Sequence, residues 1–326
     1  MSSGVLVVDK PEGMTSQGVC SFVRRLTGIR RVGHGGTLDP LATGVLPVFI
    51  GNATRVIEYM SEKDDPQAKK YRAAMRLGVS TDTQDMTGRV LSEVPAGYAF
   101  PDRAAVEAVL KSFEGEGEQT PPAYSAVKYK GRKLYDYARK GAELPEGAIK
   151  SRRIVVSGIE LLRYEVVGES TVGAAVYAPV DGVAACGFAE AEFEITCSGG
   201  LYVRTICHDA GERLGCGAAM SALRRLKSGP YLIEDSVTIA ALEEAAARGG
   251  AETLPLLPAD SAVSGLPKLI LPADEARRFT AGMRIKVDDG ASDSAVAVYR
   301  ENIQSAAFIG IGMIENGTVC PHKVLV

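Results

Sequence analysis

The sequence has no apolar run near the ~18 residues that a membrane-spanning helix requires. Its N-terminus also lacks the basic stretch and apolar region of a signal peptide. We therefore expect a globular protein that is neither inserted in a membrane nor secreted. A chain of 326 residues predicts two domains, or one large domain with an appendage.

Cysteine is scarce, and the six cysteines form no CxxC pair. Their spacing does not match a tetrahedral zinc knuckle. A long chain without a secretory signal is seldom stapled by disulfides. We therefore expect reduced, mostly buried thiols, no bound metal and a cytoplasmic location.

The motifs of several common enzyme classes are missing as well. The sequence contains no GxxxxGK[ST] phosphate loop, no GxSxG elbow and no HExxH zinc motif. Residues 33–38 fail the dinucleotide pattern GxGxxG, because Leu38 occupies its last position. Only three histidines are present. The neighbours Cys207 and His208 would point about 100° apart on a helix, which argues against a catalytic pair.

The net charge of −3 argues against a uniformly basic nucleic-acid binder, but the charges are segregated along the chain. Residues 20–80, 121–155 and 198–230 are basic, whereas residues 80–120 and 156–197 are acidic. Three basic segments that converged would form a cleft suited to phosphates. The alternative is that these runs are ordinary solvated faces.

Hydrophobic periodicity predicts a mixed domain followed by a small β-rich tail. We expect helices at 16–27, capped by Ser16 and stopped by Gly28, and at 53–60, 101–113, 132–140, 206–214 and 238–248. We expect strands at 4–8, 46–50, 71–77, 190–196 and 201–205. The Gly/Ala/Val-rich run 166–187 is interpreted as an extended hairpin or a mobile insertion.

The loop at residues 33–46 carries the best candidate for chemistry. Its glycines allow close approach of the backbone to a ligand, and Pro40 restricts the conformation of the preceding Asp39. An aspartate on such a loop can act as a nucleophile or a general base. The residues alone leave open a simple turn-forming Asp-Pro.

This loop, GHGGTLDPLATGVL, resembles the signature of the TruB-type tRNA pseudouridine synthases, G-H-x-G-x-L-D-P-x-A-x-G-x-L. Further blocks agree with that family in order. They are KPEGMTS at 10–16, KKY with LG, TDT and Asp85 at 69–85, QTPPAYSAVK at 119–128, CSGGLYVRT at 197–205 and LRRL at 223–226. Residues 308–312 and 321–325 are similar to a PUA domain, an RNA-binding β-barrel.

The resemblance implies an α+β fold with a mixed, mostly antiparallel sheet flanked by helices. It implies a catalytic domain at 1–262 and a small PUA-like β-barrel at 266–326. The implied activity is isomerisation of uridine 55 in the T loop of tRNA to pseudouridine, with a flipped base and no cofactor. The expected partner is tRNA, through its T arm and also its acceptor end at the PUA-like domain. No guide RNA and no obligatory protein partner are expected.

The resemblance also assigns roles to individual residues. Asp39 is the essential carboxylate, Arg204 pairs with it, and Tyr71 stacks on the flipped base and assists proton transfer. His34, Tyr202 and Leu223 complete the substrate-binding set. Charge and position alone predict a further set of contacts to the RNA backbone: Lys69, Lys128, Lys130, Arg132, Arg153 and Arg224.

Two residues depart from the family pattern near the site. Gly35 replaces a threonine of G-H-T-G, and Leu201 replaces a threonine of G-T-Y. Two alternatives also remain at this point: a guide-dependent synthase resembling dyskerin, and a non-catalytic protein that binds or folds tRNA. The presence of Asp39, Tyr71 and Arg204 argues against the second.

Overall fold

The computed structural model describes residues 3–60, 65–125, 127–138, 145, 147–167, 187–287, 294–302 and 306–325. The chain divides into two units, one made of Met1–Ser61 with Lys227–Val326 and the other of Glu62–Leu226. Within the described residues no helix is long and apolar enough to cross a membrane. The division into domains at residues 262 and 266 stays a prediction.

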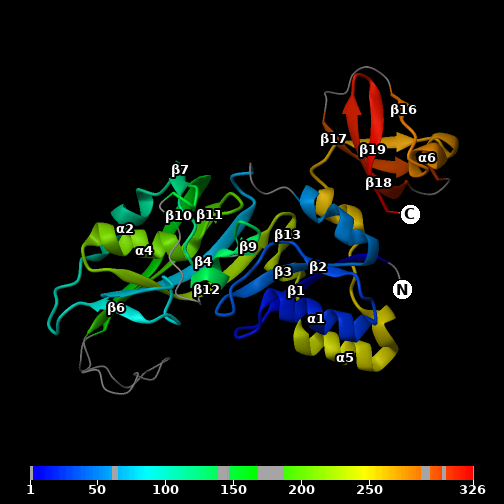
Figure 1. Ribbon diagram of the computed structural model, residues 1–326. Helices are drawn as coiled ribbons and strands as arrows, with labels where there is room; N and C mark the ends of the chain where they lie inside the picture. The colour runs from blue at the N-terminus through cyan, green and yellow to red at the C-terminus, as the bar shows by residue number, and fades with distance from the viewer. Residues whose placement is uncertain are drawn as a thin grey trace. The chain divides into compact units, whose positions relative to one another are not determined.

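The first unit is built on the antiparallel pair of β1 (Gly4–Lys10) and β3 (Thr43–Ile50) (Figure 1). Both faces of this pair are buried, so residues 4–8 of β1 form an uninterrupted apolar run instead of alternating, and Asp9 and Lys10 follow that run. Helices α1 (Ser16–Thr27) and α5 (Ile239–Gly249) cover one face, and the 3-10 helices η1 (Gly51–Tyr59) and η5 (Ala259–Val263) cover the other. The remaining elements of this part are β2 (Val32–His34), β13 (Tyr231–Leu232), η3 (Ile233–Asp235), β14 (Val237–Thr238) and η4 (Gly250–Thr253).

The C-terminal part of the same unit is a curled five-stranded sheet with strand order β15-β17-β18-β19-β16. Its elements are β15 (Lys268–Leu271), α6 (Ala273–Thr280), β16 (Ile285–Lys286), β17 (Ala295–Arg300), β18 (Ala307–Glu315) and β19 (Thr318–Val324). Gly310 permits the tight curl, because a Cβ there would lie 2.1 Å from the carbonyl oxygen of Lys323. The β-rich tail expected from the sequence is confirmed as this half-barrel.

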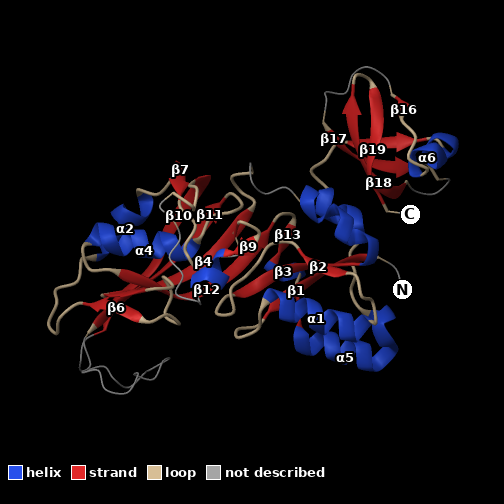
Figure 2. Cartoon of the chain, viewed as in Figure 1, coloured by secondary structure: helices blue, strands red, loops and turns tan. Residues whose placement is uncertain are grey.

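The second unit contains a sheet with strand order β12-β4-β11-β10-β7, in which β11 pairs antiparallel with both β4 and β10. Helices α2 and α4 pack against each other beside this sheet (Figure 2). Its elements are β4 (Lys69–Leu77), β5 (Val79–Thr81), β6 (Val90–Glu93), α2 (Arg103–Lys111), β7 (Gly115–Gln119), β8 (Lys128–Tyr129), β9 (Arg132–Lys133), α3 (Leu134–Ala138), β10 (Arg152–Val167), β11 (Phe188–Cys197), α4 (Val203–Leu214) and β12 (Ala218–Ser228). The expected α+β class with mostly antiparallel strands is therefore confirmed.

Three local predictions are wrong. Residues 201–205 do not form a strand, because α4 begins at Val203 and Tyr202 is its N-cap. The N-cap of α1 is Thr15, whose hydroxyl accepts a hydrogen bond from Gly18, and not Ser16. The helix expected at 132–140 begins only at Leu134, because residues 132 and 133 form the strand β9. The helix expected at 53–60 is present, as the 3-10 helix η1. Most of the run 166–187, from 168 to 186, lies outside the described residues, between β10 and β11.

None of the five described cysteines is joined in a disulfide, and Cys20, Cys197, Cys207 and Cys216 are buried. Burial raises the pKa of the Cys20 thiol to about 11 and that of Cys207 further still. These thiols therefore stay protonated and unreactive at neutral pH.

Candidate active site

The Asp39 loop is anchored to the start of α1 by one buried hydroxyl. Ser16 Oγ accepts a hydrogen bond from the Leu38 N–H at 2.8 Å and donates one to the Leu38 carbonyl at 3.0 Å. Ser16 and Leu38 are 2% and 4% exposed. Asp39 itself is only half-buried, and its carbonyl accepts from Ala42 N–H at 3.1 Å, which closes a tight turn. The Ser16 hydroxyl therefore fixes the backbone of the loop, while Asp39 stays partly accessible to solvent.

A buried lysine holds the other side of this loop. Lys10 is fully buried, and its Nζ donates to the carbonyls of Pro11, Met14 and Pro40 at 2.8, 2.6 and 3.2 Å. The Gly13 N–H also donates to the Pro40 carbonyl, at 2.8 Å. A buried ammonium is costly unless it is hydrogen-bonded, so these carbonyls fix both the lysine and the loop. The KPEGMTS block of the sequence thus serves as the support of the Asp39 loop.

Packing explains why residue 35 is a glycine. A Cβ at this position would lie 2.5 Å from Met60 Cε and 3.0 Å from a Phe49 ring carbon. Met60 and Phe49 thus fill the space that the family's threonine side chain would occupy. His34, one residue earlier, ends β2 and is half-buried.

In the second unit, Arg204 is held in the first turn of α4. Its guanidinium donates to the carbonyls of Thr83 and Tyr124, both at 3.0 Å, and pairs with Asp85 Oδ2 at 3.5 Å. The Arg204 and Asp85 side chains are 5% and 6% exposed. The position of Arg204 on a helix depends on Gln119, whose side chain bonds both the N–H and the carbonyl of Tyr202. The expected pairing of Arg204 with Asp39 stays a prediction.

Asp85 is the site residue to which the sequence analysis gave no role. Its Oδ1 accepts hydrogen bonds from Thr83 Oγ1 at 2.8 Å, from Thr87 N–H at 3.0 Å and from Thr87 Oγ1 at 2.5 Å. This web holds the carboxylate in place beside the guanidinium of Arg204. The sequence did point to Asp85, since it falls in the block at 69–85 that resembles the family. Its hydrogen bonds to Thr83, Thr87 and Arg204 become visible only in the fold.

The remaining substrate-binding candidates of this unit are mostly buried. Tyr71 lies on β4 and is 8% exposed, Leu223 lies on β12 and is also 8% exposed, and Tyr202 is half-buried. Lys69 shares the buried face of β4 with Tyr71 and is only 4% exposed. An RNA phosphate could reach Lys69 only if its surroundings opened.

Three of the predicted backbone contacts lie on one hairpin. Strands β8 and β9 are joined by the two-residue turn Lys130–Gly131, in which both φ angles are positive, at 46° and 82°. Such a turn matches the twist of the strands and presents its side chains outward. Lys128, Lys130 and Arg132 are exposed, and no carboxylate of the described residues lies within ion-pair distance of them.

The other two backbone candidates have different surroundings. Arg153 is exposed but pairs with Glu116 at 2.5 Å, which offsets its charge. Arg224 is half-buried on β12.

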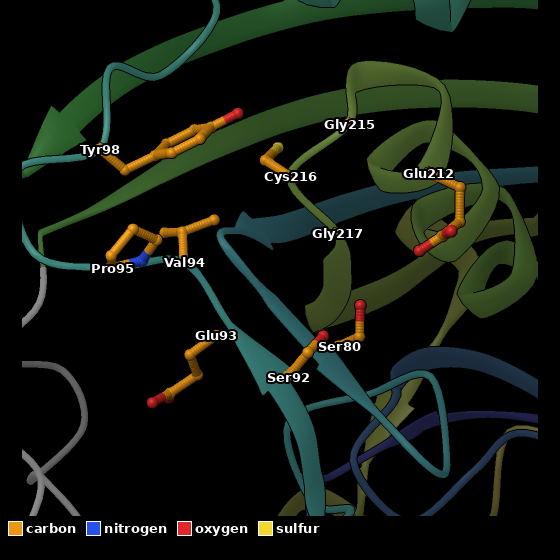
Figure 3. A pocket seen from close by; sticks show the side chains of 10 residues that line it. All are labelled: Ser80, Ser92, Glu93, Val94, Pro95, Tyr98, Glu212, Gly215, Cys216 and Gly217. Carbon is orange, nitrogen blue, oxygen red and sulfur yellow. The ribbon is translucent and has the colours of Figure 1, made fainter.

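A cavity of about 400 Å³ in the second unit lies apart from the candidate residues (Figure 3). It is lined by Ser80, Ser92, Glu93, Val94, Pro95, Tyr98, Glu212, Gly215, Cys216 and Gly217. None of the predicted site residues is among them, and the two charged side chains are both carboxylates. The negative lining would repel a phosphate, so this cavity does not serve as the RNA site.

Comparison with known proteins places the whole chain in one family. Residues 24–203 match the TruB family pseudouridylate synthase N-terminal domain, residues 204–277 the tRNA pseudouridylate synthase B C-terminal domain, and residues 267–325 the pseudouridine synthase II TruB C-terminal domain. The chain is 37% identical over 333 residues to tRNA pseudouridine synthase B of Escherichia coli K12 and, equally, of Shigella flexneri serotype 5b. Each alignment covers 99% of this chain and 95% of the relative.

Solved structures show the same fold. A structure of an H/ACA RNP bound to a substrate RNA containing 2'-deoxyuridine superimposes with a TM-score of 0.68 at 24% identity, covering 99% of this chain and 85% of the other. A Cbf5-Nop10-Gar1 complex gives a TM-score of 0.66 at 26% identity with the same coverage. With family domains matched from residue 24 to residue 325, the chain belongs to the TruB family of pseudouridylate synthases, which are RNA-modifying isomerases.

Proposed function

We propose that this chain converts uridine 55 in the T loop of tRNA to pseudouridine as a stand-alone enzyme. The observation that carries the proposal is the 37% identity, over 99% of the chain, to proteins named tRNA pseudouridine synthase B. The structural neighbours in RNP and Nop10-Gar1 complexes share the fold at lower identity, so they give no reason to expect such partners here.

The reaction needs a group that acts at the base or the sugar and a site that holds the released uracil. The N1–C1′ bond breaks, the uracil turns, and a C5–C1′ bond forms. The proton on C5 then leaves and N1 gains one, so the isomerisation consumes no co-reactant. A carboxylate suits this chemistry, and Asp39 supplies it.

The other residues hold the base and the RNA. Tyr71, Tyr202 and Leu223 provide apolar and aromatic surface for a flipped uracil, and base stacking on an aromatic ring contributes about 1–3 kcal/mol. Flipping costs a few kcal/mol, so such contacts are large enough to offset it. The β8–β9 hairpin supplies positive charge to the backbone of the T arm, and the curled C-terminal sheet takes the acceptor end.

We also propose that the protein works in the cytoplasm without a protein partner. The lack of disulfides among the five described cysteines supports a reducing compartment.

The test is to map pseudouridine by mass spectrometry in an unmodified tRNA transcript incubated with the purified chain alone. The proposal expects modification at position 55, no modification when that uridine is replaced by cytidine, and no product with Asp39→Asn. Tight binding without product would favour the non-catalytic alternative. Product only after addition of a guide RNA would favour the guide-dependent one.

A further inference from the structure

Four arginines lie on contacting segments of the first unit and belong to none of the candidate sets described above. Arg24 lies in the last turn of α1, Arg30 and Arg31 precede β2, and Arg55 lies on η1. We refer to these four residues as the arginine cluster. Strand β2 contacts both α1 and η1, which brings the three segments together (Figure 1).

Backbone contacts hold the cluster in place. The Arg24 guanidinium donates to the carbonyl of Arg30 at 3.2 Å and to that of Val32 at 2.7 Å, so it braces the turn that carries its neighbours. The carbonyl of Arg31 accepts a hydrogen bond from Gly51 N–H at 2.8 Å, which ties this turn to the start of η1.

Side-chain contacts bring Arg31 and Arg55 to the same surface. Arg31 donates to Asn52 Oδ1 at 3.5 Å. Asn52 and Arg55 are three residues apart on a 3-10 helix, so they share a face. Arg55 in turn donates to the backbone carbonyl of Val324.

No carboxylate of the described residues lies within ion-pair distance of any of the four guanidinium groups. The acid on η1, Glu58, is already engaged by Lys323 at 2.6 Å, and this hydrogen bond lowers the pKa of Glu58. Among exposed arginines elsewhere, Arg72 is matched by Glu194 and Arg163 by Glu192, whereas Arg132 on the β8–β9 hairpin is unmatched like the cluster. The cluster therefore keeps its positive charge for a ligand.

We propose that the arginine cluster binds backbone phosphates of the RNA substrate, as a contact surface additional to the β8–β9 hairpin. This inference rests on the proposed function for the identity of the ligand. Guanidinium groups bind phosphate through paired N–H donors. Arg24 spends its donors on backbone carbonyls and adds charge, whereas the exposed Arg30, Arg31 and Arg55 supply the direct contacts, and such a row suits successive phosphates better than a single anion.

The test compares three double variants by binding of a fluorescein-labelled T-arm hairpin at increasing NaCl. Arg30→Ser with Arg31→Ser removes two charges from the cluster. Arg163→Ser with Arg248→Ser removes two exposed charges elsewhere and is the matched control. Arg30→Lys with Arg31→Lys keeps the charge. Arg24 is left intact because its hydrogen bonds hold the turn, and thermal melting verifies that each variant is folded.

We expect the first variant to weaken binding at least about tenfold at 100 mM salt and to reduce the slope of log Kd against log salt by about 1.4–1.8. KM should rise with kcat unchanged at saturating RNA. The control and the lysine variant should keep the wild-type slope. Equal slopes for the first variant and the control would overturn the inference, as would a loss confined to kcat. Failure of the proposed function is a separate result, since it shows as absence of pseudouridine with the wild type.

Discussion

The Ser16 hydroxyl should contribute strongly to the stability of the protein. It makes hydrogen bonds to both the N–H and the carbonyl of Leu38, the residue before Asp39. In Ser16→Ala the Leu38 N–H and carbonyl stay buried without this partner. Each buried group that loses its hydrogen bond costs about 1–3 kcal/mol. Partial relaxation of the loop toward solvent reduces the sum, so we expect the free energy of unfolding to fall by about 2–4 kcal/mol.

The same substitution should also loosen the Asp39 loop in the folded protein. We therefore expect kcat to fall with little change in KM, because Ser16 lies beneath the loop and is 2% exposed. Urea unfolding and turnover of a T-arm substrate measure the two effects. The matched control is Ser21→Ala on the same helix, whose exposed hydroxyl donates to the Gln17 carbonyl and accepts a long hydrogen bond of 3.5 Å from Arg24. If Ser16→Ala and Ser21→Ala behaved alike in both assays, the reasoning would be refuted.

Three further substitutions have expected outcomes. Asp85→Asn should lower the free energy of unfolding by about 3 kcal/mol and reduce kcat, because an amide cannot neutralise the buried guanidinium of Arg204. Glu194→Gln should cost up to about 1 kcal/mol at pH 7, since its partners are half-exposed. The pKa of Glu194 is lowered mainly by its hydrogen bond to Lys70, so this stability exists above the ordinary value of 4.5 and disappears as the pH falls through the folded pKa. Gly211→Ala should destabilise by about 2 kcal/mol despite a gain of about 1 kcal/mol in helix propensity, because the new Cβ would lie 2.0 Å from the Ala218 nitrogen.

Each of these outcomes has a measurement that could contradict it. Urea unfolding of Asp85→Asn at wild-type stability would contradict the buried pair. For Glu194→Gln, urea unfolding at pH 7 and at pH 3 gives the loss in free energy of unfolding relative to wild type. This loss should be smaller at pH 3, and an equal loss at both pH values would contradict the prediction. Thermal melting of Gly211→Ala is compared with Gly265→Ala, where a Cβ meets nothing within 4 Å. Equal melting temperatures would refute the clash.

Local patterns in the sequence were enough to predict several elements correctly. Strict alternation predicted β11, and its glutamates do lie on the less buried face while Phe193 and Ile195 are buried. Gly28 ends α1 in the left-handed conformation that glycine tolerates. The Asp39 loop was found by its glycines and its Asp-Pro pair, features that act within a few residues.

The error at residues 201–205 and the omission of Asp85 share one physical cause, which is contact between residues distant in the chain. Residues 201–205 looked like a strand because of β-branched Val203 and Thr205, yet Gln119, 83 residues earlier, fixes Tyr202 as a helix cap. Asp85 could not be assigned as the partner of Arg204 because 119 residues separate them.

The most direct test of the account is tritium release from unmodified tRNA labelled at uridine C5, with no other protein or RNA added. Wild type is compared with Asp39→Asn and with Asp102→Asn, a control in which asparagine replaces aspartate as an equally good cap of α2. The account predicts release by the wild type and Asp102→Asn, and none by Asp39→Asn. Release by Asp39→Asn at the wild-type rate, or no release by the wild type, would contradict it.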